Sequence, residues 1–126
     1  MECLIDSNVL IDYVAEQFNA TQLKKLDEIF DSSFAISIIT KIETLGYNAH
    51  QADEEKMKLF LSLASVIMLN DEIVQKTIDL KKSVKIKTPD AIIAATALVK
   101  GLTIISRNTI DFKKLPGLKV VNPYEF

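Results

Sequence analysis

Short apolar runs alternate along the chain with longer stretches in which apolar residues recur every three or four positions. The short runs predict strands at residues 2–5, 34–37, 65–69, 102–105 and 118–121, and the longer stretches predict helices at 8–15, 21–30, 38–47, 53–63, 71–83 and 88–100. Strands that alternate with helices indicate an α/β domain whose mainly parallel sheet is covered on both faces. Because no repeat, low-complexity segment or linker interrupts the pattern, we expect one domain over residues 1–126.

Three details of this pattern give further expectations. Residues 65–69 are apolar enough to form a buried strand, and the helix at 88–100 is apolar nearly all round, which predicts that it is buried. Ser7 or Asn8 is expected to cap the first helix. Gly101 is expected to end the helix at 88–100.

Four acids fall where the predicted sheet would bring them together. Asp6 follows the first strand, Glu43 lies in the helix after the second, Asp90 lies in the first turn of the helix at 88–100, and Asp111 follows the strand at 102–105. In a parallel α/β sheet, strand ends and helix starts line the same edge, where such folds bind ligands. The sequence therefore predicts an acidic site at that edge.

Each acid taken alone has an ordinary structural explanation. Asp6 precedes a helix, Thr40 and Glu43 have the spacing of a capping box, Thr88-Pro89-Asp90 is typical of a helix start, and Asp111 fits a turn. Together, carboxylates on one edge repel and raise each other's pKa. A hard divalent cation relieves that conflict, and a ligand set made only of oxygens suits Mg²⁺ and is accepted by Mn²⁺.

Composition narrows the class of protein without fixing its partner. Of the 126 residues, 48% are hydrophobic and 25% are charged, which is enough to build a core. The apolar stretches fall short of the roughly 20 residues of a membrane span, and no signal peptide is visible. The lone Cys3 has no partner for an internal disulfide. We therefore expect a cytoplasmic protein without membrane contact. A net charge of −2 is compatible with nucleic acid held through a basic patch or bound cations.

Four blocks in order, "LIDSNVLI", "SIITKIETLGY", "TPDAIIAATALVKGLTIISRNTIDF" and "LPGLKVVNPYEF", resemble the PIN-domain proteins, specifically the VapC-like ribonuclease toxins of type II toxin–antitoxin pairs. The resemblance runs from residue 4 to the carboxyl end and is weak over residues 12–35 and 48–87. It implies a PIN-like three-layer α/β/α domain with a central, mainly parallel sheet of four to five strands.

The resemblance also implies a metal-dependent endoribonuclease that uses Mg²⁺ or Mn²⁺. Its catalytic and metal-binding residues would be Asp6, Glu43, Asp90 and Asp111, with Ser7, Asn8 and Asn108 as polar supports. In the implied mechanism the three aspartates hold the ion directly or through water, and Glu43 orients or deprotonates the attacking water. Ser7 stands where many members have Thr, but no departure from the family pattern removes an acid.

The same resemblance implies partners: an RNA substrate, a cognate antitoxin that blocks the acidic pocket, and a second copy of the chain in a homodimer. The stretch "FDSSFAISII" and the helices up to Leu63 are where family members make such protein contacts, although core packing explains the same residues. The sequence contains no motif that selects a particular RNA.

The basic residues leave alternatives open. Arg107 adjoins Asn108 at the proposed site and would either contact an RNA phosphate or pair with an acid. A basic run either grips phosphates or forms a solvated helix end; its members are Lys81, Lys82, Lys85 and Lys87. The only histidine, His50, lacks the spacing of a catalytic triad or a zinc site and is expected at the surface.

Two other functional classes stay open at this point. A non-catalytic PIN-fold module that binds RNA or a regulatory partner would keep the acids without turnover. A phosphoaspartyl enzyme also gathers acids at this edge of a parallel sheet, but "DSNVL" lacks the second acid of such a nucleophile motif and no lysine ends the strand at 102–105.

Overall fold

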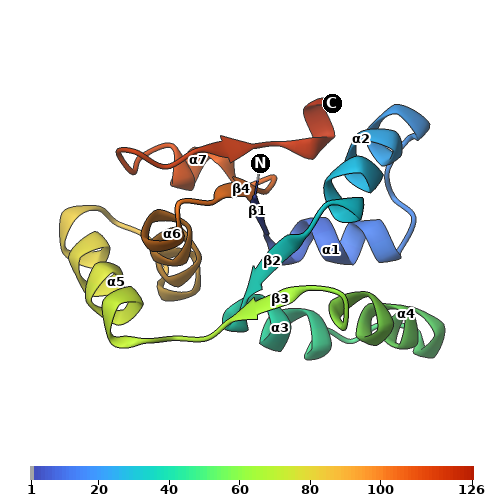
Figure 1. The fold of residues 1–126 in the computed structure, drawn as a ribbon, viewed down its shortest axis with the longest axis horizontal. Helices are drawn as coiled ribbons and strands as arrows, with labels where there is room; N and C mark the ends of the chain where they lie inside the picture. The colour runs from blue at the N-terminus through green and yellow to red at the C-terminus, as the bar shows by residue number, and fades with distance from the viewer. Residues whose placement is uncertain (1) are drawn as a thin grey trace.

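The fold is built on a five-stranded sheet in which all neighbouring strands are parallel. The computed structural model describes residues 2–126, and the strand order is β3-β2-β1-β4-β5. The strands are β1 (Cys3–Ile5), β2 (Phe34–Ser37), β3 (Ser65–Ile67), β4 (Thr103–Ile105) and β5 (Val120–Val121). The predicted parallel sheet is thereby confirmed, with β1 at its centre (Figure 1).

Helices connect the strands and cover the sheet. They are α1 (Ser7–Val14), α2 (Ala20–Asp31), α3 (Ile38–Leu45), α4 (Gln51–Leu61), α5 (Asp71–Ser83), α6 (Thr88–Lys100) and α7 (Thr109–Phe112), followed by the 3₁₀ helix η1 (Pro123–Glu125). The pattern of apolar residues predicted all of these except α7 and η1, which are too short to show a helical period. None of the helices within residues 2–126 is long and apolar enough to cross a membrane.

Alternate residues of each strand feed two separate apolar cores. Leu4, Ala35 and Ile104 belong to a core completed by α5 and α6, whereas Ile5 and Ile36 belong to one completed by α1, α2 and α4. This alternation is the period of a strand, and it buries both faces of the sheet. Figure 1 shows α5 and α6 on one side of the strands and α1, α2 and α4 on the other, which is the expected three-layer arrangement.

The structure confirms some local predictions and corrects others. The inner positions of α6 are buried as predicted, and Gly101 ends the helix with a left-handed φ of 67°, a conformation that glycine adopts without steric cost. The strand predicted at residues 65–69 forms, but its predicted length and its predicted burial are wrong. That strand ends at Ile67 and is only partly buried, because β3 is an edge strand.

The predicted helix caps were displaced by one residue. Asp6, not Ser7 or Asn8, is the N-cap of α1, and its side chain accepts the Ser7 backbone N–H. Lys87 occupies the N-cap position of α6, so Thr88 is already helical. The one-residue shift at Asp6 matters, because it makes a single carboxylate both a helix cap and a member of the acidic edge.

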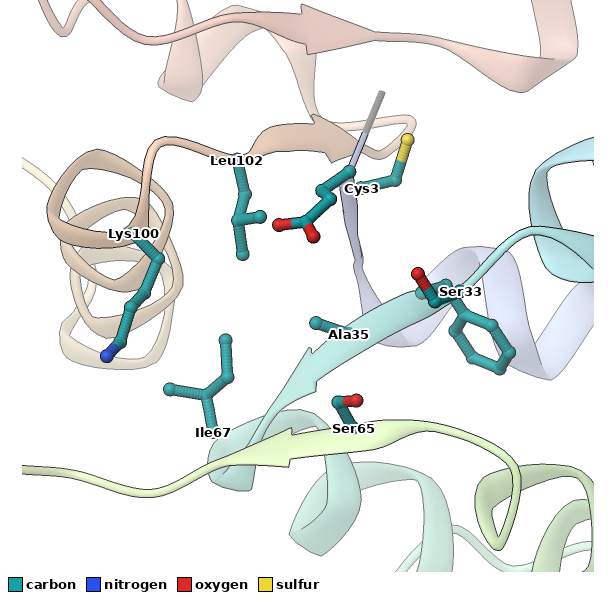
Figure 2. A pocket seen from close by; sticks show the side chains of 9 residues that line it. Cys3, Ser33, Ala35, Ser65, Ile67, Lys100 and Leu102 are labelled. Carbon is teal, nitrogen blue, oxygen red and sulfur yellow. The ribbon is translucent and has the colours of Figure 1, made fainter.

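The two edges of the sheet differ in what they expose. At the carboxyl edge β1 leads into Asp6, β2 into α3 and β4 into Ser106. At the amino edge lies a hollow of about 290 Å³, which we call the amino-edge hollow (Figure 2). Its lining residues are Glu2, Cys3, Ser33, Phe34, Ala35, Ser65, Ile67, Lys100 and Leu102.

Candidate active site

Asp6 is the most enclosed acid of the carboxyl edge, with 4% of its surface exposed. One carboxylate oxygen, Oδ1, accepts the Ser7 N–H at 2.8 Å. The other, Oδ2, accepts the Ser106 hydroxyl at 2.6 Å and the Asn8 side-chain amide at 3.2 Å. Burial raises the pKa of Asp6, these hydrogen bonds lower it, and the negative charge of Glu43 raises it again.

Ser106 organises the segment that follows β4, and sequence reasoning missed it. Its hydroxyl donates to Asp6 and also accepts the Asn108 backbone N–H at 2.9 Å, with the side chain fully buried. The available signal was positional: Ser106 follows β4 as Asp6 follows the neighbouring strand β1. A hydroxyl can donate to a carboxylate while accepting from an amide, so Ser106 couples two parts of the site.

Asp90 lies in the first turn of α6, as predicted, and faces the same region. Its Oδ2 accepts the side-chain amide of Asn108 at 3.4 Å. Burial and then the negative charges of Asp6, Asp111 and Glu43 raise the pKa of Asp90, while Lys87 lowers it. Asp90 is therefore close enough to the three other acids for their negative charges to oppose its ionisation.

Glu43 projects from the exposed side of α3. Its Oε1 accepts the Ser7 hydroxyl at 2.7 Å. The capping box considered for Thr40 and Glu43 does not form, because α3 begins at Ile38 and is capped by Ser37. Glu43 is therefore directed by a residue of α1 toward the acidic edge and does not close its own helix.

The three acids and their supports surround one open hollow of about 510 Å³, which we call the carboxyl-edge hollow. It is lined by Asp6, Ser7, Asn8, Ile11, Glu43, Gly46, Tyr47, Asp90 and Asn108. The structure thus brings together three of the four predicted acids and all three predicted polar supports. The polar groups that line it are carboxylate, amide and hydroxyl groups.

Asp111 lies to the side of this hollow, on α7. Lys114 contacts its Oδ1 at 3.2 Å, and this hydrogen bond, with a second from Asn108, lowers the pKa of Asp111. Its charge nevertheless contributes to the raised pKa of Asp90. Within residues 2–126 no group of three or more Asp, Glu, His or Cys side chains is arranged so that all could hold one metal ion.

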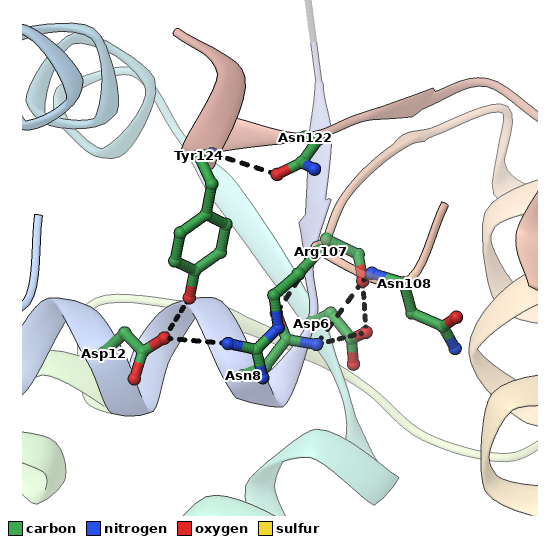
Figure 3. A network of polar contacts seen from close by, with 8 residues as sticks. Asp6, Asn8, Asp12, Arg107, Asn108, Asn122 and Tyr124 are labelled. Carbon is green, nitrogen blue, oxygen red and sulfur yellow. Dashed lines mark hydrogen bonds and ion pairs between the residues drawn. The ribbon is translucent and has the colours of Figure 1, made fainter. Parts of the chain in front are cut away.

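Arg107 joins the site to the last turn of the chain (Figure 3). Its backbone N–H donates to Asn8 Oδ1 at 3.3 Å, and its guanidinium group lies 3.6 Å from Asp12 Oδ2 and 5.3 Å from the centre of the Tyr124 ring. The Tyr124 hydroxyl donates to the same Asp12 oxygen. Of the two roles considered for Arg107, the structure contains the pairing with an acid.

The Asp12–Tyr124 pair was not predicted from the sequence. Burial, followed by the hydrogen bond to Asp12, raises the pKa of Tyr124, so its hydroxyl keeps its proton at neutral pH. Asp12 lies one helical turn beyond Asn8 on α1, so both side chains reach the segment after β4. This spacing was the only available signal, and it did not identify Tyr124.

The other residues singled out in the sequence lie apart from the hollow. Lys81, in the last turn of α5, donates to the Ile86 carbonyl at 2.8 Å, in the segment that follows the helix. Lys87 is near enough to Asp90 and Asp111 to lower their pKa values. His50 is exposed before α4, and Cys3 is buried, both as expected.

Comparison with known proteins identifies the class. The family model for the PIN domain matches residues 3–118, and the chain belongs to the PIN-domain family. It is similar to a chain of a toxin–antitoxin complex from Klebsiella pneumoniae, with 35% identity, coverage of 98% of this chain and 99% of that one, and a TM-score of 0.80.

Two further relatives extend the comparison. Ribonuclease VapC1 of Methanocaldococcus jannaschii is 28% identical over 124 residues, covering 93% of this chain and 85% of that protein. The structure of VapBC2 from Rickettsia felis bound to a promoter DNA fragment shares the fold, with a TM-score of 0.81, 20% identity and coverage of 97% and 98%.

Proposed function

We propose that this chain is a metal-dependent endoribonuclease that hydrolyses RNA phosphodiester bonds and acts as the toxin of a type II toxin–antitoxin pair. The observation that carries the proposal is the carboxyl-edge hollow, where Asp6, Glu43 and Asp90 converge at the end of a parallel sheet. Similarity to a protein named a ribonuclease and to a chain of a toxin–antitoxin complex supports the activity and the biological role. We further propose that residues 1–126 form one PIN-like domain, a view supported by the two cores on opposite faces of one sheet.

The donors present suit Mg²⁺ or Mn²⁺. They are oxygens, and two of the carboxyl groups have a pKa raised partly by neighbouring negative charge, which a cation would offset. Mg²⁺ keeps several waters and uses few protein ligands, which agrees with an acidic hollow where, within residues 2–126, no three acids are placed to hold one ion together. Asp6, Asp90 and Asp111 would hold the ion, directly or through water.

The chain's own side chains would then divide the work. When bound, Mg²⁺ would supply positive charge near a phosphodiester oxygen and would acidify water. Ser7 holds Glu43 through Oε1, and Oε2 has no hydrogen-bond partner within residues 2–126, so it is free to take the proton of the attacking water. Ser106 and Asn8 fix the Asp6 carboxylate, and Asn108 orients Asp90.

The remaining partners follow from the same proposal. Exposed apolar side chains on α3 and α5, among them Ile42, Leu45, Val74 and Ile78, support a cognate antitoxin and a homodimer as partners. A purified neighbour-encoded protein should bind and inhibit the enzyme, and light scattering should give the mass of two chains. The proposed RNA substrate supports a cytoplasmic site of action. The free, buried Cys3 is compatible with that compartment, where thiols stay reduced.

The test is cleavage of total RNA by purified protein, free of antitoxin, in Mg²⁺, Mn²⁺ or EDTA. We expect cutting in Mg²⁺ or Mn²⁺, loss in EDTA, and at least a roughly 100-fold loss in Asp90→Asn, whose folding is checked by circular dichroism. Cutting that persists in EDTA or in the variant would contradict the proposal. RNA binding without any cutting would favour the non-catalytic module.

A further inference from the structure

One aromatic side chain differs from all the others in its surroundings. The chain has six phenylalanines, three tyrosines and no tryptophan, and within residues 2–126 Tyr47 is the most exposed of these aromatic side chains, at 51%. Within residues 2–126, its hydroxyl makes no hydrogen bond to the protein, and its ring packs against no other aromatic ring, whereas Tyr13 and Tyr124 do both. An exposed, unpartnered ring has no visible part in holding the fold together.

The backbone presents this ring to the acidic site. Tyr47 comes directly after Gly46, which ends α3, and lies four residues beyond Glu43. A Cβ atom at Gly46 would lie 2.8 Å from the Ile42 carbonyl oxygen, so the close turn that leads to Tyr47 requires glycine. Glu43 and Tyr47 consequently line the same carboxyl-edge hollow.

Tyr47 also lines a second hollow, of about 540 Å³, between α1 and the start of α4. We call it the side hollow. It shares Ile11 and Tyr47 with the carboxyl-edge hollow, so the Tyr47 side chain stands between the two hollows and borders both. Each is of a size that accommodates a nucleotide-sized group.

The charges of the side hollow indicate which part of a nucleic acid it takes. Its lining includes Asp53, His50 and Asp12, which is paired with Arg107, and within residues 2–126 no Lys or Arg lines it. Without a cation such as the one proposed for the carboxyl-edge hollow, these acids would repel a phosphate, whereas they would not repel an uncharged base. Gln17 and Asn48 add amide groups, which can pair with base edges.

We propose that Tyr47 is a base-stacking residue, on which the nucleobase beside the scissile phosphate stacks while that phosphate occupies the carboxyl-edge hollow. Single-stranded RNA is commonly held by bases stacked on aromatic side chains, because every base has a flat face. The inference rests on the proposed nuclease function and adds a substrate subsite to it, for an unpaired base.

Steady-state cleavage of a short single-stranded RNA in Mg²⁺ tests this subsite. Tyr47→Ala should raise KM by about tenfold, the effect of losing one stacked base, with kcat nearly unchanged. Tyr47→Phe should behave like the wild type, because it keeps the ring. Leu59→Ala is the matched control: it removes another exposed apolar side chain, 73% exposed and in neither hollow, and should change neither constant.

Binding gives a readout that does not require cleavage. Because the chain has no tryptophan, Tyr47→Trp places a single fluorophore between the two hollows. In the Asp90→Asn background, single-stranded RNA should quench its fluorescence, and an abasic strand of the same length should quench it much less.

The outcomes separate this inference from the proposed function. An unchanged KM in Tyr47→Ala, or equal quenching by normal and abasic strands, would overturn the stacking role even if the enzyme cleaves RNA. A Tyr47→Ala variant that loses only antitoxin binding would overturn it too, assigning the ring to a protein interface. Base-dependent quenching in a protein that never cleaves RNA would uphold the subsite while contradicting the nuclease.

Discussion

The two ends of α6 lie at opposite edges of the sheet and belong to hollows of opposite character. Asp90, in its first turn, lines the carboxyl-edge hollow, and Lys100, in its last turn, lines the amino-edge hollow. At the first, three carboxyl groups converge, and within residues 2–126 no Lys or Arg joins them in the lining. At the second, one acid and one base accompany serines and apolar side chains (Figure 2).

The difference follows from the direction of the chain. In a parallel sheet the helices start at the carboxyl edge, where their positive ends favour acids, and finish at the amino edge, where lysine is favoured. Dipoles alone do not explain the carboxyl edge, because they do not account for a nearly fully buried Asp6 that accepts three hydrogen bonds. The carboxyl edge therefore combines acids that oppose one another's ionisation, which indicates a function, whereas the amino edge has the composition expected of an ordinary surface.

The largest expected contrast comes from making the same substitution at both edges. Glu43→Gln removes a carboxylate held by Ser7, so kcat for RNA cleavage should fall at least roughly 100-fold. Glu2→Gln makes the identical change in the amino-edge hollow and should leave kcat within about twofold. Equal effects of the two substitutions would mean that the two edges do not differ in function.

A smaller contrast is expected from removing one hydroxyl. Ser106→Ala deletes the hydrogen bond that lowers the pKa of Asp6, so that pKa should rise. Because Asp6 acts when ionised, the acidic limb of the pH–rate profile should move to higher pH. Activity above that limb should also fall by about tenfold, because the carboxylate is held by one hydrogen bond fewer.

Ser65→Ala provides the control at the amino edge. The Ser65 hydroxyl makes no hydrogen bond within residues 2–126, and its removal should leave the pH–rate profile where it is. A Ser106→Ala enzyme with reduced activity but an unshifted acidic limb would show that Ser106 only supports the fold.

The sequence predicts the acidic edge wherever an acid's position follows from the order of strands and helices along the chain. Asp6, Glu43 and Asp90 each stand next to a strand end or in a helix at the carboxyl edge, and that placement follows from alternating strands and helices. Chain order also predicts Asp111 at this edge. The ion pair between Asp111 and Lys114 could not be predicted, because α7 has only four residues and shows no helical period.

Contacts made at long range could not be predicted from local patterns. Tyr124 and Asp12 are separated by 112 positions, and their meeting depends on how η1 packs against α1 and α2. In the same way, Ile11 of α1 and Tyr47, which follows α3, come from different elements and line the same two hollows. Sequence periodicity fixes which face of an element is buried, but not which side chains from distant elements meet at its exposed rim.

The smallest expected effect is on stability, where Asp90→Asn should raise the thermal unfolding midpoint by a few degrees in EDTA at neutral pH. Folding raises the pKa of Asp90, so its charged form is disfavoured in the folded chain. The unfolding free energy of the wild type should therefore increase as pH is lowered through that raised pKa toward the ordinary 3.8. The advantage of Asp90→Asn, measured by calorimetry, should disappear over the same range, because the wild-type carboxyl group is then protonated.

Ala35→Val separates this effect from ordinary packing. Ala35 lines the amino-edge hollow from β2, where a β-branched side chain suits the strand, so Val should add up to about 1 kcal/mol of stability at every pH without reducing activity. Asp90→Asn should instead gain stability only where the acid is ionised, and should lose RNA cleavage. If Asp90→Asn were less stable than the wild type in EDTA at neutral pH, the carboxyl groups would not be in conflict, and the charge argument for a cation at this edge would fail.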